Sequence, residues 1–243
     1  MKHLKMIMSV LVLLMMFSCT KKQVEEKGNV SFSLISNVDI AEVTKANVSD
    51  LTTLPSSDDF TITITDVSSV QIWSGKVSEW DPSTQITAGD YTVTAAYSSV
   101  DEEGFDKPYF YGTQTFTVTG GQTSAVSVPV SLGNTAILVT CTKNFTDYFK
   151  EYNFKLMRDG SDIVTFVKGE GRAAFIDAYK FDIVGTFEGE TGTYGYQDSH
   201  TNLEAATLYT FVFDVDNTGG ARLTVRFNHN VDTVDLEDYE LND

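Results

Sequence analysis

The chain of 243 residues contains few cysteines and few basic residues. It has two cysteines, Cys19 and Cys141, so acylation of Cys19 would leave no possible disulfide and burial of a core would have to stabilise the protein alone. Lys and Arg together number 17 against 34 Asp and Glu, which gives a formal net charge of -17. A protein this acidic repels nucleic acid backbones, which argues against a DNA or RNA partner. The hydrophobic content of 42% is that of a globular protein and excludes disorder or a collagen-like repeat.

The N-terminal apolar segment is also short. It covers residues 6–17, which is 12 residues, whereas a membrane-spanning helix needs about 20. It follows a basic start and precedes a serine and a cysteine, which is typical of a signal peptide for Sec export, here residues 1–18. The string Met16-Phe17-Ser18-Cys19 resembles a bacterial lipobox, although Met and Phe depart from the usual residues in its first two places.

The lipobox resemblance implies that Cys19 carries a diacylglycerol on its thiol and an acyl chain such as palmitate on its amine. Several acyl chains hold a protein stably on a membrane where one chain does not. We therefore expect a lipid anchor at the outer membrane or cell surface, with residues 19–29 as a flexible tether. The alternative is an ordinary signal peptide with an incidental cysteine.

From residue 30 onward the sequence is dominated by alternation of apolar and polar residues. Phe60, Ile62 and Ile64 alternate with threonines, which is typical of a half-buried strand. Similar segments cover residues 30–34, 70–72, 91–97, 115–119 and 126–132, and then 136–141, 152–157, 163–167, 180–187, 209–215 and 222–227. This pattern predicts an all-β protein of two tandem β-sandwich domains, residues 30–132 and 133–243.

Three details of this prediction can be tested individually. Pro129 lacks an amide donor, so we expect its strand at a sheet edge. Aromatic residues at helical spacing predict one short helix over residues 145–152, with Asn144 as its cap. The predicted core consists of Phe60, Ile62, Tyr91, Val93 and Phe116 in the first domain and Phe181, Ile183, Phe211, Phe213, Leu223 and Val225 in the second.

Residues that could carry chemistry are sparse. His200 and His229 lie in no Ser-centred elbow, HExxH or Cys-His pattern, so we expect them on loops or strand surfaces. Cys141 continues an alternating apolar face, which favours a small buried residue over a catalytic thiol. Residues 214–219 begin like a calcium loop, but Val225 stands where a bidentate Glu belongs, so a hairpin turn is favoured. We therefore expect no enzyme activity, cofactor or metal site, with an unrecognised hydrolase as a lesser alternative.

Two aromatic segments, which we expect to be loops, have the composition of sugar-binding surfaces. Tyr109 and Tyr111 lie in one, and Tyr194 and Tyr196 in the other, each with carboxylate, amide or hydroxyl groups nearby. Rings of this kind stack on sugars while the polar groups bind hydroxyls. The alternative is that these rings close the ends of the sandwiches.

The order of several motifs resembles an uncharacterised family of Bacteroides-type surface lipoproteins, which is similar in layout to fimbrillin-like proteins. The motifs are Thr44-Lys-Ala46, Asp59-Phe-Thr-Ile-Thr-Ile, Ala88-Gly-Asp-Tyr-Thr-Val-Thr-Ala-Ala-Tyr97, Pro108-Tyr-Phe-Tyr-Gly112 and Phe116-Thr-Val-Thr-Gly-Gly121. The resemblance implies two Greek-key, transthyretin-like β-sandwiches and a structural or adhesive role at the cell surface. A surface lipoprotein that captures glycans is the alternative function.

Fimbrillin-like proteins also imply a processing step. In them, a protease cuts after a basic residue beyond the first strand and frees a groove that a strand of another subunit fills. The corresponding bond here is Lys45-Ala46, about ten residues beyond the predicted strand 30–35. The segment 37–57 is polar and poorly periodic, which favours an exposed connection. The alternative is an uncut loop in a monomer.

Overall fold

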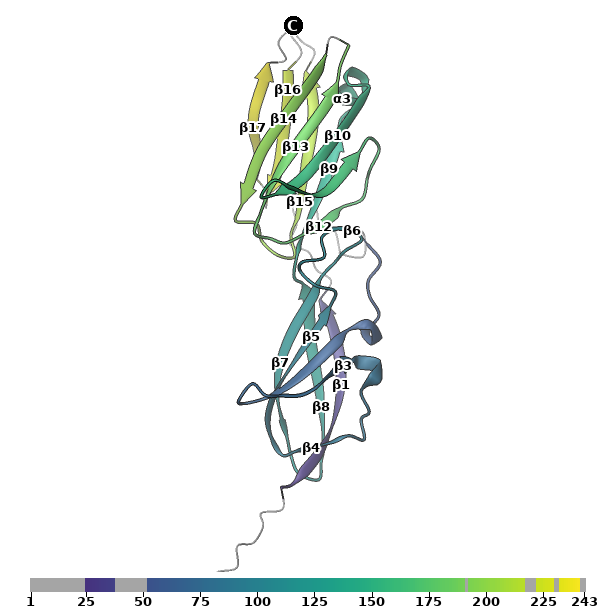
Figure 1. Cartoon of the computed structure of the whole chain (residues 1–243), viewed down its shortest axis with the longest axis vertical. Coiled ribbons are helices and arrows are strands. Elements are labelled where there is room, and N and C mark those ends of the chain that lie inside the picture. Colours follow the sequence, from purple (N-terminus) through teal and green to yellow (C-terminus); the bar gives the residue numbers. More distant parts are fainter. Residues whose placement is uncertain (1–24, 38–51, 191, 217–221, 230–231, 241–243) are drawn as a thin grey trace, which may run out of the picture.

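The computed structural model is an elongated molecule of two β-rich lobes arranged end to end (Figure 1). It describes residues 25–37, 52–190, 192–216, 222–229 and 232–240. Cys19, Lys45 and Ala46 lie outside the described residues. The all-β prediction is confirmed, and the single α-helix of the described part, α3, spans Lys143–Tyr148.

The first lobe is one seven-stranded sheet folded around a single core. Its strand order is β3-β2-β5-β7-β8-β1-β4. The strands are β1 (Lys27–Asn37), β2 (Thr61–Asp66), β3 (Gln71–Lys76), β4 (Gln85–Thr87), β5 (Gly89–Tyr97), β7 (Phe110–Val118) and β8 (Thr123–Leu132), with the 3-10 helices η1 (Ser57–Asp59) and η2 (Val77–Glu79) between them. Inward-facing residues of β1, β2, β4, β5, β7 and β8 meet in one buried cluster. The sheet therefore closes over its own apolar face.

The second lobe is a sandwich of two sheets, with orders β11-β10-β13-β14 and β17-β16-β15-β9-β12-β6. Its strands are β9 (Thr135–Cys141), β10 (Glu151–Arg158), β11 (Ser161–Val167), β12 (Ala174–Ile176), β13 (Lys180–Glu188), β14 (Thr193–Thr201), β15 (Leu208–Asp216), β16 (Arg222–His229) and β17 (Asp232–Glu240). The predicted core residues of this lobe are all buried between the two sheets. In the first lobe, Phe60, Ile62, Tyr91 and Val93 are buried as predicted, whereas Phe116 is only partly buried.

The two lobes are joined by more than the chain between them. The two-residue strand β6 (Gly104–Phe105) comes from the sequence of the first lobe but pairs with β12 of the second (Figure 1). Beside it, Glu103 accepts hydrogen bonds from Arg158 Nη1 and from the backbone N–H of Asp177, both at 2.6 Å. Because Glu103 and Arg158 are largely shielded from solvent, removing either would leave a poorly solvated charge at the junction.

Two local predictions are corrected. The helix begins at Lys143 and is capped by Thr142, whose Oγ1 accepts a hydrogen bond from the N–H of Phe145 at 3.3 Å, so Asn144 is inside the helix. It ends at Tyr148 because the chain becomes extended at Phe149, whose ring is buried in the second core.

Pro129 is not on an edge strand, because β8 lies between β7 and β1. The N–H of Asn29 donates to Gln122 O, so the backbone N–H and C=O groups of the even-numbered residues of β8 face β1. The backbone groups of the odd-numbered residues face β7. The N–H that Pro129 lacks would therefore have pointed toward β7. There the paired positions between the two strands are limited, among the described residues, to Phe110 with Leu132 and Tyr111 with Ser131. Proline is tolerated because the β7–β8 ladder is already interrupted beside it.

Candidate strand-addition site

The first strand is attached to its sheet on one side for most of its length. From Asn29 to Asn37, β1 runs parallel to β8. On its other side, β4 pairs only with Lys27, Gly28 and Asn29. From Val30 onward, no strand of the described part of the chain pairs with this second side, so β1 is an edge strand there. We call the surface that β1 covers the β1 slot; it is formed by β8, Trp80, Phe116 and the turn between β7 and β8.

Just beyond the end of β4, a side chain takes the place of a neighbouring strand and hydrogen-bonds the free edge of β1. Trp80 follows η2, and its Nε1–H donates a hydrogen bond of 2.9 Å to the carbonyl oxygen of Val30. Trp80 is buried and Val30 is 0% exposed, so this carbonyl group is shielded from solvent. The indole therefore replaces the strand that would otherwise satisfy the acceptor.

The inward face of β1 is apolar and aromatic. Phe32 meets Trp80 edge-on with ring centroids 5.3 Å apart, and meets Phe116 in the same manner at 5.8 Å. Leu34 is half-buried against the same core. On the opposite face, the hydroxyl of Ser33 hydrogen-bonds the hydroxyl of Ser127 at 3.0 Å. Loss of β1 would therefore expose both an apolar surface and the backbone groups of β8.

The four tyrosines considered as glycan contacts do not form one site. Tyr109 and Tyr111 lie near the start of β7 with ring centroids 6.3 Å apart, and Tyr111 is 43% exposed. Tyr194 and Tyr196 lie in β14, not in a loop. Tyr196 is buried edge-on to Phe213 at 5.3 Å, and Tyr194 packs on Phe149. Tyr196 therefore packs inside the protein and is not available to a sugar, whereas the ring of Tyr111 is accessible.

The expectation of a surface position for His200 is wrong. This residue lies in β14, is 8% exposed, and stacks on Phe181 with ring centroids 5.3 Å apart. Its Nε2 lies 3.2 Å from Asp198 Oδ2 but makes no hydrogen bond with a described residue. Burial lowers the pKa of His200, and Asp198 and Asp182 oppose this effect. The side chain of His229 lies outside the described residues.

Cys141 does not have the properties of a catalytic thiol. It is partly buried at the end of β9, and burial raises the pKa of its thiol to about 12, against a smaller opposing effect from the side chain of Tyr152. A thiol with this pKa is not ionised at neutral pH and is a poor nucleophile.

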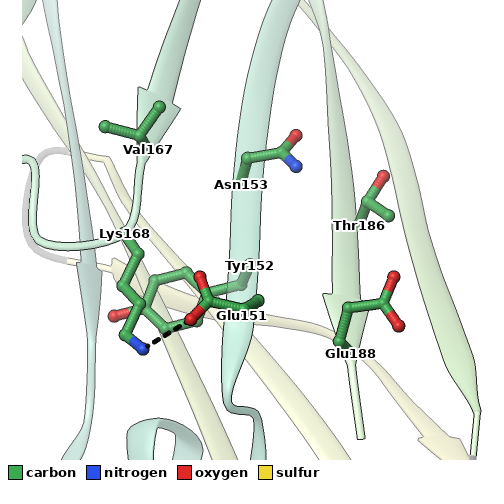
Figure 2. A pocket seen from close by; sticks show the side chains of 7 residues that line it. All are labelled: Glu151, Tyr152, Asn153, Val167, Lys168, Thr186 and Glu188. Carbon is green, nitrogen blue, oxygen red and sulfur yellow. Dashed lines mark hydrogen bonds and ion pairs between the residues drawn. The ribbon is translucent and has the colours of Figure 1, made fainter.

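A shallow hollow of about 430 Å³ lies on the outer face of the second lobe, over β10 and β13 (Figure 2). Glu151 and Glu188 stand opposite each other there. Glu151 is paired with Lys168 at 3.2 Å, and both oxygens of Glu188 accept from the hydroxyl of Thr193. Neighbouring side chains therefore already engage both carboxylates.

Among the described residues, no group of three or more His, Cys, Asp or Glu is arranged to hold a metal ion. No helix in this part of the chain combines the length and apolar character needed to cross a membrane.

The residues most important to the β1 slot could not be identified from the sequence. Trp80 is 50 residues from Val30, and no local pattern relates the two. Gly28 fell within the predicted tether, yet it is buried within β1. The only signal available was the alternation of Val30, Phe32 and Leu34, which identified the strand but not its neighbours.

Several solved structures resemble most of the chain at low sequence identity. A fimbrial assembly protein from Parabacteroides distasonis is 10% identical, with 88% of this chain and 97% of that chain covered and a TM-score of 0.48. A "putative cell adhesion protein" from Bacteroides ovatus is 12% identical, with coverage of 91% and 100% and a TM-score of 0.47. "Putative polysaccharide binding proteins" from Bacteroides thetaiotaomicron are 10% identical, with coverage of 88% and 99% and a TM-score of 0.47.

No curated protein sequence matches the chain. A family model does match it, from residue 26 to residue 241, and therefore spans both lobes. The chain belongs to the DUF4493 family, described as a domain of unknown function.

Proposed function

We propose that this chain is a non-enzymatic surface protein with a structural or adhesive role, and that it joins other subunits by accepting a strand in the β1 slot. The observation that carries the proposal is the position of β1. It is the first strand, it is held by β8 along one side, and its far side is free of strands within the described residues from Val30 onward. If β1 leaves, the three-residue strand β4 loses its sheet partner, while β3, β2, β5, β7 and β8 stay paired with one another.

An emptied slot would bind a replacement strongly. Departure of β1 would uncover the ring of Phe116 and the buried face of β8, including Val128, which is 0% exposed. It would also leave backbone groups along β8 without partners. An incoming strand supplies hydrogen bonds through its backbone and fills the apolar surface through alternate side chains.

The anchor and the processing step complete the proposal. Acylation of Cys19 would hold the protein at the outer membrane or cell surface through a tether that ends at the start of β1. Cleavage of Lys45-Ala46 would separate β1 from the remainder of the chain. After cleavage, β1 would be retained only by its contacts in the slot.

N-terminal sequencing of protein released from intact cells tests the processing step. A start at Ala46, together with oligomers on a native gel, is the expected result. A Lys45→Gln variant, which removes the basic residue before the bond, should remain uncut and monomeric. Recovery of intact acylated monomers alone from wild-type cells would contradict strand addition.

A second candidate function, glycan binding, is favoured by the accessible ring of Tyr111 beside Tyr109. If these rings form a sugar platform, Tyr111→Ala should abolish binding on a glycan array with little change in melting temperature. Tyr196→Ala is the matched control, because its ring is buried and its loss should lower the melting temperature instead.

A further inference from the structure

The backbone around β1 approaches closely at Gly28, near the beginning of the strand. At this position the backbone of β1 contacts the turn between β7 and β8. The N–H of Gly121 donates to Lys27 O at 2.8 Å, and the N–H of Asn29 donates to Gln122 O at 2.9 Å. The strand is therefore fixed to the turn by a backbone hydrogen bond on each side of Gly28.

These bonds leave no room for a side chain at Gly28. A Cβ placed there would lie 2.4 Å from the carbonyl oxygen of Thr119 and 2.9 Å from that of Gln122. Both obstacles are backbone atoms, which cannot rotate away as a flexible side chain would. Glycine is needed here because two segments of backbone approach closely, not because of an unusual φ.

The following inward positions have different requirements. The position of Val30 is completely enclosed, with its carbonyl oxygen bonded to Trp80, so it suits an aliphatic side chain of limited size. The position of Phe32 lies between the rings of Trp80 and Phe116, which suits an aromatic side chain. The position of Leu34 is half-buried and apolar.

Resting on the proposed strand addition, we infer that the β1 slot selects an extended segment with the order glycine, aliphatic, aromatic, aliphatic at alternate positions. Within the 243 residues, only residues 28–34 carry this order. The C-terminal strand β17, Asp232–Glu240, contains no glycine. A copy of this chain therefore cannot supply the segment from its C-terminal strand.

A second copy is also a poor donor of its own β1. An uncut copy that gives up β1 opens an identical slot, so the exchange gains no contacts. The occupant is therefore a segment of a different subunit that carries the order glycine, aliphatic, aromatic, aliphatic. In an assembly, this chain binds a distinct partner in preference to copies of itself.

Peptide uptake by the full chain tests this inference. A recognition sequence for a specific protease is inserted between Lys45 and Ala46, the purified protein is cut there, and fluorescent peptides are added in excess. A peptide of residues 26–37 should enter the slot. Its Ser33→Ala version, altered on the outward face, should enter within about twofold of the same level. The Gly28→Ala version should be taken up about tenfold less or worse, and the β17 peptide should not enter.

The possible failures are distinguishable. Equal uptake of the Gly28→Ala peptide, or entry of the β17 peptide, would overturn the selection by sequence while leaving strand addition intact. Uptake of no peptide at all would overturn strand addition and this inference with it. The uncut protein gives an independent measurement: Gly28→Ala should increase hydrogen exchange of the β1 amides about tenfold or more, whereas Ser33→Ala should not. Equal exchange in the two variants would also overturn the inference.

Discussion

The hydrogen bond from Trp80 to Val30 should control how readily β1 leaves its sheet. Replacing Trp80 by Phe keeps an aromatic ring beside Phe32, whose centroid lies 5.3 Å from that of the indole, but removes the Nε1–H donor. The carbonyl oxygen of Val30 would then be shielded from solvent without a partner. Leaving a buried acceptor unsatisfied costs about 1–3 kcal/mol.

This cost should appear mainly as easier opening of β1. Opening returns the carbonyl group to water, so the substitution destabilises the closed state alone. A difference of 1–3 kcal/mol corresponds to roughly a 5- to 150-fold increase in the population of the open state. Hydrogen exchange followed by mass spectrometry should detect this as faster exchange in β1, while the amides of β5 provide an internal reference.

Trp73→Phe is the matched control. Trp73 lies on β3 and its ring is edge-on to that of Trp80 at 5.1 Å, but its indole is not the donor to β1. Exchange of β1 amides should change by less than about twofold in this variant. If the two variants accelerate β1 exchange equally, packing of the rings, and not the hydrogen bond, retains the strand and the reasoning is refuted.

The alternation of apolar and polar residues predicted those strands whose buried side chains are aliphatic or otherwise fully apolar. In β2, Ile62 and Ile64 are both 0% exposed, while Thr63 faces outward to bond Ser74. The same logic failed for β14, whose buried positions are Tyr196 and His200. Because both side chains carry polar atoms, the sequence indicates an aromatic loop here instead of a strand. Its burial depends on aromatic neighbours contributed by strands distant in the sequence.

For a related reason, the sequence predicted the strand β1 but not the residues that surround it. The inward face of β1 follows from its own sequence, since Val30, Phe32 and Leu34 alternate with serines. The neighbours that give the slot its selectivity are contributed by turns, by the indole of Trp80 and by the backbone around Thr119. Such contacts depend on topology, in this case a parallel pairing of β1 with β8 that brings together residues 94 positions apart.

Three further predictions concern the anchor, the core and pH. Cys19→Ala should move the protein from the membrane to the soluble fraction, because each buried acyl methylene contributes ~0.8 kcal/mol; unchanged membrane recovery would exclude lipidation as the anchor. Phe213→Ala should lower the free energy of unfolding in urea by about 3–5 kcal/mol, because the ring is 0% exposed and lies 4.2 Å from that of Phe154; a loss below about 1 kcal/mol would refute this packing. The free energy of unfolding should fall as pH drops below 6.5, the unshifted pKa of histidine, because burial lowers the pKa of His200 in the folded protein. In that pH range His200 is protonated in the unfolded chain but neutral in the folded chain, so lowering the pH stabilises the unfolded state. The effect levels off once the pH is below the pKa of His200 in the folded protein. His200→Phe should remove this part of the pH dependence, and an identical slope in both proteins would contradict the assignment to His200.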